Sequence, residues 1–139
     1  MNIDNLKAQL TIDEGRKKHI YVDTVGKITA GVGRNLTDRD FSDDEIDLML
    51  TNDIELVERQ LDISLPWWRS MSEARQTVLA NMAFNMGIAG LLKFKNTLGA
   101  MMGGRFDDAA KGMLDSLWAK QTGARAQRLA AIMRTGQFP

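Results

Sequence analysis

Two carboxylates near the front of the chain have the types and spacing needed for acid–base chemistry. Glu14 ends a stretch with helical spacing, and Asp23 follows in a stretch that alternates like a β-hairpin. A helix end and a strand can converge, so the two side chains are able to face one another across a groove. Cleaving a glycosidic bond takes one acid to protonate the leaving oxygen and one carboxylate to stabilise charge or activate water. Spacing alone leaves open that both are ordinary solvated acids.

Few other residues offer chemistry. Thr29 is expected on the strand opposite Asp23, where its hydroxyl can hold a water. The chain has no cysteine, which excludes thiol nucleophiles and thiolate metal sites. His19 is a lone histidine, whereas zinc sites need three or four ligands, so we expect no metal. Gly31 and Gly33 lack the following Lys-Ser/Thr of a phosphate loop, and no cofactor is expected.

The elements that position these residues begin with a helix over 2–14, which Gly15 stops. A hairpin is predicted over 19–33, with a turn at 25–27 and a third strand through Asn35. The sequence from Ser42 to Glu45 is a capping box, and an apolar stripe then predicts one long helix to about Ile63.

The second half predicts a helical bundle. Pro66 ends the long helix, and Ser72 opens a helix that runs to Gly87. Shorter helices are expected over 91–102, 106–118 and 123–135. We interpret Trp67, Trp68 and Trp118 as packing residues, although the first two also have the rings to stack on sugars. The fold class is therefore α+β, predominantly α, with one small antiparallel sheet.

Length and charge bound the class of protein. The 139 residues suit one domain, no apolar run is long enough for a membrane span, and no signal peptide is expected at the N-terminus. The net charge is zero, but residues 1–65 hold 14 acids and 8 bases, while residues 66–139 hold 4 acids and 10 bases. Such asymmetry suggests that the second half meets a charged partner.

Several ordered motifs together resemble the phage-type lysozymes, glycoside hydrolase family 24. The first half carries I-D-E-G, I-Y-V-D-T and G-x-x-T-x-G-x-G. The second half adds segments that resemble the family's own in the same order, at 80–87, 94–98, 105–110, 118–122 and 134–136. The likeness spans roughly 3–136 and is weakest over 37–71.

The resemblance implies a single lysozyme domain with two lobes. The small lobe, about 12–62, holds the sheet. The helical lobe takes 1–11 and 66–139, so the first helix belongs with it. A helix from about 42 to 63 joins the two lobes, and the substrate lies in the cleft between them.

The family's roles carry over onto matching residues. The resemblance implies Glu14 as general acid, protonated in a low-polarity setting, with Asp23 ionised and Thr29 positioning the attacking water. Water arriving on the opposite face of the sugar gives inversion. Arg125 is implied to orient Glu14. Substrate contacts are implied at Asn35, Phe84 and Thr97.

Some positions depart from the family pattern. Arg34 stands where a histidine is common, and Asn85 replaces a glutamine. Gly112 replaces an expected polar substrate contact. A segment of the longer relatives is missing between Thr37 and Phe41, so we expect a smaller outer lip. These changes affect the subsites and leave the catalytic residues in place.

The expected function is hydrolysis of the β-1,4 bond between N-acetylmuramic acid and N-acetylglucosamine in bacterial peptidoglycan. The expected role is that of a monomeric phage or prophage endolysin, held in the bacterial cytoplasm until a separate holin-type protein gives it access to the wall. No stable membrane insertion is expected. Two alternatives stay open, a lytic transglycosylase and a catalytically silent wall-binding module of the same fold.

The basic second half has a rival interpretation as a nucleic-acid face. A neutral chain without a recognition-helix signature argues against that, so no nucleic-acid partner is expected. Peptidoglycan and its attached polymers are anionic, which suits a basic lobe. The basic residues concerned are Arg105, Lys111, Lys120, Arg125, Arg128 and Arg134.

Overall fold

The computed structural model describes all residues, Met1–Pro139, and has the α+β, mostly helical class expected from the sequence. The chain divides into two compact units, Met1–Asp47 and Leu48–Pro139. The boundary falls inside the long helix α2 (Asp43–Ser64). The assignment of residues 1–11 to the helical lobe stays a prediction.

The first unit starts with α1 (Ile3–Glu14), as predicted. The Asn2 side chain caps its N-terminus by accepting a hydrogen bond from the Asn5 N–H. The helix stops at Gly15, whose φ of 77° is a conformation that glycine tolerates best. Within the structure, none of the α1 residues is buried.

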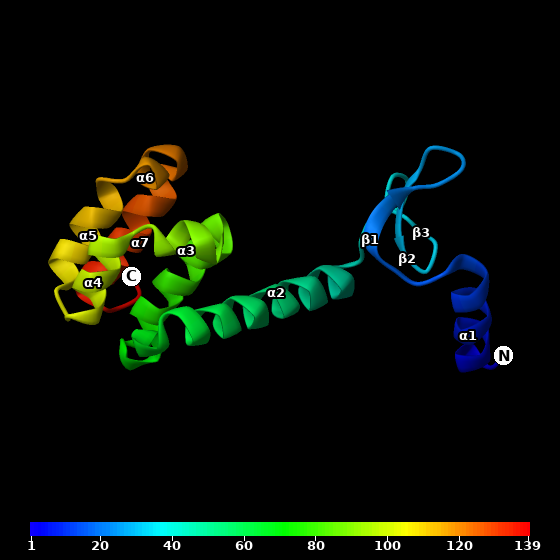
Figure 1. Ribbon diagram of the computed structural model, residues 1–139, viewed down its shortest axis with the longest axis horizontal. Helices are drawn as coiled ribbons and strands as arrows, with labels where there is room; N and C mark the ends of the chain where they lie inside the picture. Colours follow the sequence, from blue (N-terminus) through cyan, green and yellow to red (C-terminus); the bar gives the residue numbers. More distant parts are fainter. The chain divides into compact units, whose positions relative to one another are not determined.

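The predicted hairpin and third strand are confirmed as one antiparallel sheet of order β1-β2-β3 (Figure 1). Its strands are β1 (Lys17–Val22), β2 (Ile28–Gly31) and β3 (Arg34–Asn35). Tyr21 pairs with Thr29, and an irregularity in β1 shifts the register between Lys17 and Tyr21.

The predicted capping box opens α2. The Ser42 hydroxyl accepts from the Glu45 N–H at 3.2 Å, and the Glu45 carboxylate accepts from the Ser42 N–H at 2.8 Å. The helix ends at Ser64, close to the predicted end, and its second half buries Val57 and Leu61 in the core of the second unit.

The second unit is a bundle of helices, which Figure 1 shows. Their buried side chains form one apolar core. Methionines and alanines fill much of this core, because flexible and small side chains suit close helix packing. The most deeply buried include Leu61, Leu79, Met82, Met113 and Met133. The elements after α2 are η1 (Pro66–Ser70), α3 (Glu73–Leu92), α4 (Lys95–Met102), α5 (Phe106–Leu114), α6 (Leu117–Thr122) and α7 (Ala124–Thr135).

Two expected helix boundaries are wrong. The expected helix over 91–102 begins only at Lys95, because the chain bends at Gly87 (φ 79°) and continues helically to Leu92. The expected helix over 106–118 is two helices. The Ser116 side chain accepts from the Ala119 N–H and so starts α6 afresh.

The tryptophans pack as predicted. Trp68 and Trp118 are buried in the core of the second unit, and Trp67 lies against it. The Trp68 indole N–H donates to Asp62 at 2.7 Å, and that of Trp118 donates to Asn85 at 2.8 Å, so the N–H group of each buried indole has a hydrogen-bond partner.

No single helix is long and apolar enough to cross a membrane. The helices α3 and α4 meet that test of length and composition only as a pair, and this pair is bent by 109°.

Candidate active site

Glu14 is the last residue of α1 and lies in the same unit as the sheet. Its side chain is exposed and contacts the turn between β2 and β3. A methyl group placed on Gly33 would lie 2.8 Å from Oε2 of Glu14 and 3.0 Å from its Cδ. The helix end and the sheet therefore do converge, with the carboxyl group against the backbone of that turn.

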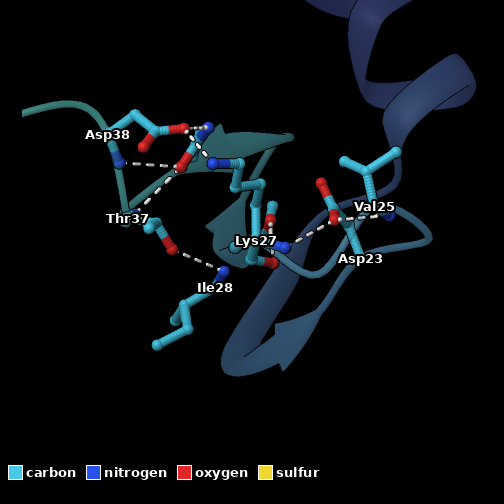
Figure 2. A network of polar contacts seen from close by, with 8 residues as sticks. Asp23, Val25, Lys27, Ile28, Thr37 and Asp38 are labelled. Atoms are coloured by element: carbon cyan, nitrogen blue, oxygen red, sulfur yellow. Dashed lines mark hydrogen bonds and ion pairs between the residues drawn. The ribbon is translucent and has the colours of Figure 1, made fainter.

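Asp23 follows β1 and holds the turn into β2 (Figure 2). Its Oδ1 accepts from the Val25 N–H at 3.0 Å and from the Lys27 N–H at 2.8 Å. Its backbone N–H donates to the Lys27 carbonyl at 2.9 Å. These bonds fix the orientation of the carboxylate. Its Oδ2 accepts no hydrogen bond from the protein and is free for water or substrate.

Thr29 lies on β2, and the residues that contact Asp23 and Glu14 lie before and after it in the sequence. Lys27, two residues before it, donates to Asp23, and Gly33, four residues after it, contacts Glu14. The Thr29 side chain is 4% exposed, and its hydroxyl donates to the Lys27 carbonyl at 3.1 Å. That donation leaves the lone pairs of the hydroxyl to accept from a water. The segment 27–33, which contains β2, therefore carries Thr29 and contacts both carboxylates.

Asn35 takes part in a local turn network with Thr37 and Asp38. Its Oδ1 accepts from the N–H groups of Thr37 and Asp38, and its amide donates to the Asp38 carboxylate at 3.0 Å. Lys27 also pairs with Asp38 at 2.9 Å. Hydrogen bonds from Lys27 and Asn35 hold the pKa of Asp38 below its usual value. The role of Asn35 in binding substrate stays a prediction.

An ion pair between Arg34 and Glu45 joins β3 to the first turn of α2. The hydrogen bond from Arg34, helped by the backbone bond from Ser42, lowers the pKa of Glu45 to about 2. From the sequence, Arg34 is notable only because the family commonly has a histidine there, and Glu45 only because it belongs to the capping box. Their pairing was not predicted, because it joins residues from different elements.

The second unit holds Arg125 and Phe84. Both line a pocket of about 450 Å³ between α2, η1 and α3, with apolar walls that include Leu50 and Ile54. Arg125 donates from Nε and Nη2 to the Oδ1 of Asn81, at 2.9 and 2.7 Å. Asn81, not singled out from the sequence, therefore holds Arg125 in place.

Thr97 does not line that pocket. It is 6% exposed in α4, and Gly112 of α5 packs directly onto it. A methyl group on Gly112 would overlap the Thr97 hydroxyl. Because position 112 is a glycine, α4 and α5 pack closely at this point, and no side chain fits there.

No group of three or more His, Asp or Glu side chains is placed to hold a metal ion.

Comparison with known proteins adds the family. The phage lysozyme family model matches residues 11–134. The chain is 31% identical over 162 residues to "Pre-baseplate central spike protein Gp5" of Enterobacteria phage T4, covering 96% of this chain and 28% of that protein. It is 24% identical to "Probable T4-type lysozyme 1" and 26% identical to "Probable T4-type lysozyme 2" of Dictyostelium discoideum. Each of these matches covers 96% of this chain and 96% of the relative.

The matched stretches are longer than the 139 residues of this chain, so the relatives carry residues that it lacks. The segment expected to be missing between Thr37 and Phe41 stays a prediction, because the matched lengths do not place these residues. The family match spans the α1 end, the sheet and most of the bundle. The chain belongs to the phage lysozyme family, and with it to the lysozyme-type glycoside hydrolases that act on peptidoglycan.

Proposed function

We propose that the protein hydrolyses the β-1,4 bond between N-acetylmuramic acid and N-acetylglucosamine, with inversion, and that Glu14, Asp23 and Thr29 carry the reaction. The observation that supports this most strongly is the order of contacts over residues 27–33, the segment that contains β2. Asp23 bonds to Lys27, Thr29 follows, and Glu14 lies against Gly33. An inverting glycosidase needs an acid, a second carboxylate and a water that is held for attack, and this segment contacts or carries one candidate group for each.

In this proposal Glu14 protonates the leaving oxygen of the sugar. Its side chain is exposed and therefore open to a bound substrate. A sugar chain that covers Glu14 would exclude water and create the low-polarity setting that keeps a carboxylic acid protonated.

The attacking water lies between Asp23 and Thr29. The water donates one hydrogen bond to the Oδ2 of Asp23 and one to the Thr29 hydroxyl. As the water attacks the sugar carbon, it gives one proton to the Asp23 carboxylate and keeps the other. The backbone N–H bonds on Oδ1 hold the carboxylate still while the water attacks. A water held in this way is already in position when the substrate binds, so the attack does not depend on a water arriving from solution.

Arg125 is proposed to orient Glu14, and Asn35, Phe84 and Thr97 to contact substrate, as the family resemblance implies. The Asn81 bonds support a fixed role for Arg125, since they use two of its N–H donors and leave the others free. The exposed ring of Phe84 offers a face on which a sugar can stack.

The chemistry is tested on purified peptidoglycan by mass spectrometry of the released fragments. Hydrolysis with water leaves reducing ends, and a lytic transglycosylase leaves anhydro ends. We expect reducing ends, and Thr29→Val should slow their release because it removes the hydroxyl that holds the water. Anhydro products would assign the chain to the transglycosylases. No products from a folded protein that binds the wall would indicate a silent module.

We also propose the biological role of a monomeric endolysin that waits in the host cytoplasm and reaches the wall through a holin-type protein. Two relatives that match over 96% of their own length are named as lysozymes, which supports the wall-cutting activity that this role needs. A second role is favoured by the 31% identity to a phage spike protein, namely a wall-cutting part of a virus particle. Expression with and without a holin distinguishes them. An endolysin lyses cells only when the holin is present, and a spike module is recovered in assembled particles.

A further inference from the structure

Gly33, in the turn that follows β2, has no side chain, and the carboxyl group of Glu14 occupies the space that a Cβ atom would take. A methyl group on Gly33 would lie 2.8 Å from Oε2, 3.0 Å from Cδ and 3.1 Å from Cγ of Glu14. These distances are shorter than van der Waals contact, so no residue with a Cβ fits without moving the carboxyl group. The present position of the Glu14 carboxyl therefore requires glycine at position 33.

The backbone of Gly33 is held in place from the following residue. Arg34 pairs with Ala30 in the sheet and forms its ion pair with Glu45. Glu45 is in turn held by the reciprocal cap with Ser42. Gly33 thus presents a fixed backbone surface to Glu14, in contrast to a mobile loop that would adapt to the side chain.

We propose that Gly33 is a positioning residue for the catalytic acid, and that it sets the place of the Glu14 carboxyl group by having no side chain. This inference rests on the proposed function of Glu14. A general acid must be within hydrogen-bond reach of the atom it protonates. Displacement of such a group by about 1 Å is able to cost about 10²-fold in rate.

A different reason for glycine has to be separated from this one. Gly33 has a φ of +64°, a conformation that penalises any other residue regardless of its neighbours. Gly31 provides the matched control, because it lies two residues earlier at the end of β2 with the same φ of +64°, and a methyl group there meets nothing within 4 Å. Gly31→Ala therefore carries the backbone penalty alone, and Gly33→Ala carries the same penalty plus the collision with Glu14.

The first test measures kcat and KM of both variants on soluble peptidoglycan fragments. We expect Gly33→Ala to lower kcat about 10²-fold relative to Gly31→Ala. The KM of both variants should stay near that of the unmodified protein, since displacing the acid affects the transition state more than the bound substrate. Equal kcat values for the two variants would overturn the proposal.

The second test measures stability and does not depend on activity. Each glycine variant is made with Glu14 intact and with Glu14→Ala, which removes the three Glu14 atoms nearest to the new methyl group. With Glu14 intact, Gly33→Ala should lower the unfolding midpoint more than Gly31→Ala does. In the Glu14→Ala background the two should have the same effect, as the coupling in a double-mutant cycle requires. An unchanged difference would overturn the contact.

The two tests separate this inference from the function beneath it. If Glu14→Gln stays fully active, the acid is assigned wrongly and the positioning role falls with it. If Glu14→Gln is inactive and Gly33→Ala matches Gly31→Ala in both tests, the proposed function stands and only the inference about Gly33 is overturned.

Discussion

Arg34 and Glu45 form an ion pair that ties the last strand of the sheet to the first turn of α2. Both side chains are partly covered, at 24% and 32% exposure. A pair of this kind within one small unit adds more than a solvated surface pair, because less of its attraction is screened by water. It also holds the turn on which the Glu14 carboxyl lies.

Stability of the first unit should therefore fall in acid. The pKa of Glu45 is lowered from 4.5 to about 2, so its contribution is fully present above about pH 4.5 and is lost as the pH falls toward 2. Glu45→Gln keeps the cap to Ser42 and removes the charge. We expect this variant to be less stable than the unmodified protein at pH 6 and equally stable near pH 2, in thermal unfolding followed across that range.

Asp44→Asn is the control for Glu45→Gln, because Asp44 lies in the same first turn but forms no ion pair. It reports the effect of one negative charge on the helix dipole. If both variants lose the same stability at pH 6, the pair with Arg34 contributes nothing and the prediction is wrong.

The bonds between Arg125 and Asn81 predict a coupling that stability measurements can detect. Asn81→Ala removes the acceptor of two hydrogen bonds and leaves a partly covered guanidinium without its partner. The loss should be about 1–3 kcal/mol. In the Arg125→Ala background the same substitution should cost much less. Asn96→Ala, at an exposed residue without a side-chain bond, is the control, and additive losses would contradict the coupling.

Gly112 and Thr97 predict a reversal of the usual effect of alanine in a helix. Gly→Ala inside a helix normally stabilises by about 0.5–1 kcal/mol, and Gly99→Ala in α4, where a methyl group meets nothing, should do so. Gly112→Ala should instead destabilise by about 1–3 kcal/mol, because it overlaps the Thr97 hydroxyl.

The Gly112 effect should disappear when the obstacle is removed. In the Thr97→Ala background, Gly112→Ala has space for its methyl group and should recover most of the lost stability. Chemical denaturation of the four proteins gives the comparison. A stabilising Gly112→Ala in the unmodified protein would show that α4 and α5 are not packed as described.

How far the sequence could predict this structure depended on the range of each signal. The Gly15 stop and the Ser42–Glu45 cap act over a few residues, and both were predicted. The Ser116 cap is equally local, but apolar spacing on both sides concealed it. The contact of Gly33 with Glu14 joins residues far apart in the sequence, and no local pattern reports a missing side chain that another element fills.

The candidate site divides in the same way. Glu14, Asp23 and Thr29 are marked in the sequence by residue type and family motif, and their catalytic roles stay a prediction. Asn81 could not be identified in this way, since its importance comes from its hydrogen bonds with an arginine on another helix.

The difference in net charge between the two halves of the sequence becomes smaller when the charges are counted in the two structural units. Met1–Asp47 holds ten acids and seven bases, and Leu48–Pro139 holds eight acids and eleven bases.

The remaining charge division predicts salt-sensitive binding to the anionic wall. Binding to insoluble peptidoglycan should weaken between low and high salt, because about 1 M salt shortens the screening length to about 3 Å. Lys111→Gln and Lys120→Gln, at exposed positions of the second unit, should reduce both the binding and its salt dependence. Lys7→Gln in the first unit is the control. Binding that ignores salt would show that contacts to the sugars dominate.

The most direct measurement is the initial rate at which purified protein releases fragments from peptidoglycan, with and without the carboxylic acid at Glu14. Glu14→Gln keeps the size of the side chain and should slow the reaction by about 10²–10⁴-fold or more. Asp13→Asn, at the preceding exposed acid of α1, should leave the rate close to that of the unmodified protein. A Glu14→Gln protein that releases fragments as fast as Asp13→Asn would contradict the assignment of Glu14 as the catalytic acid.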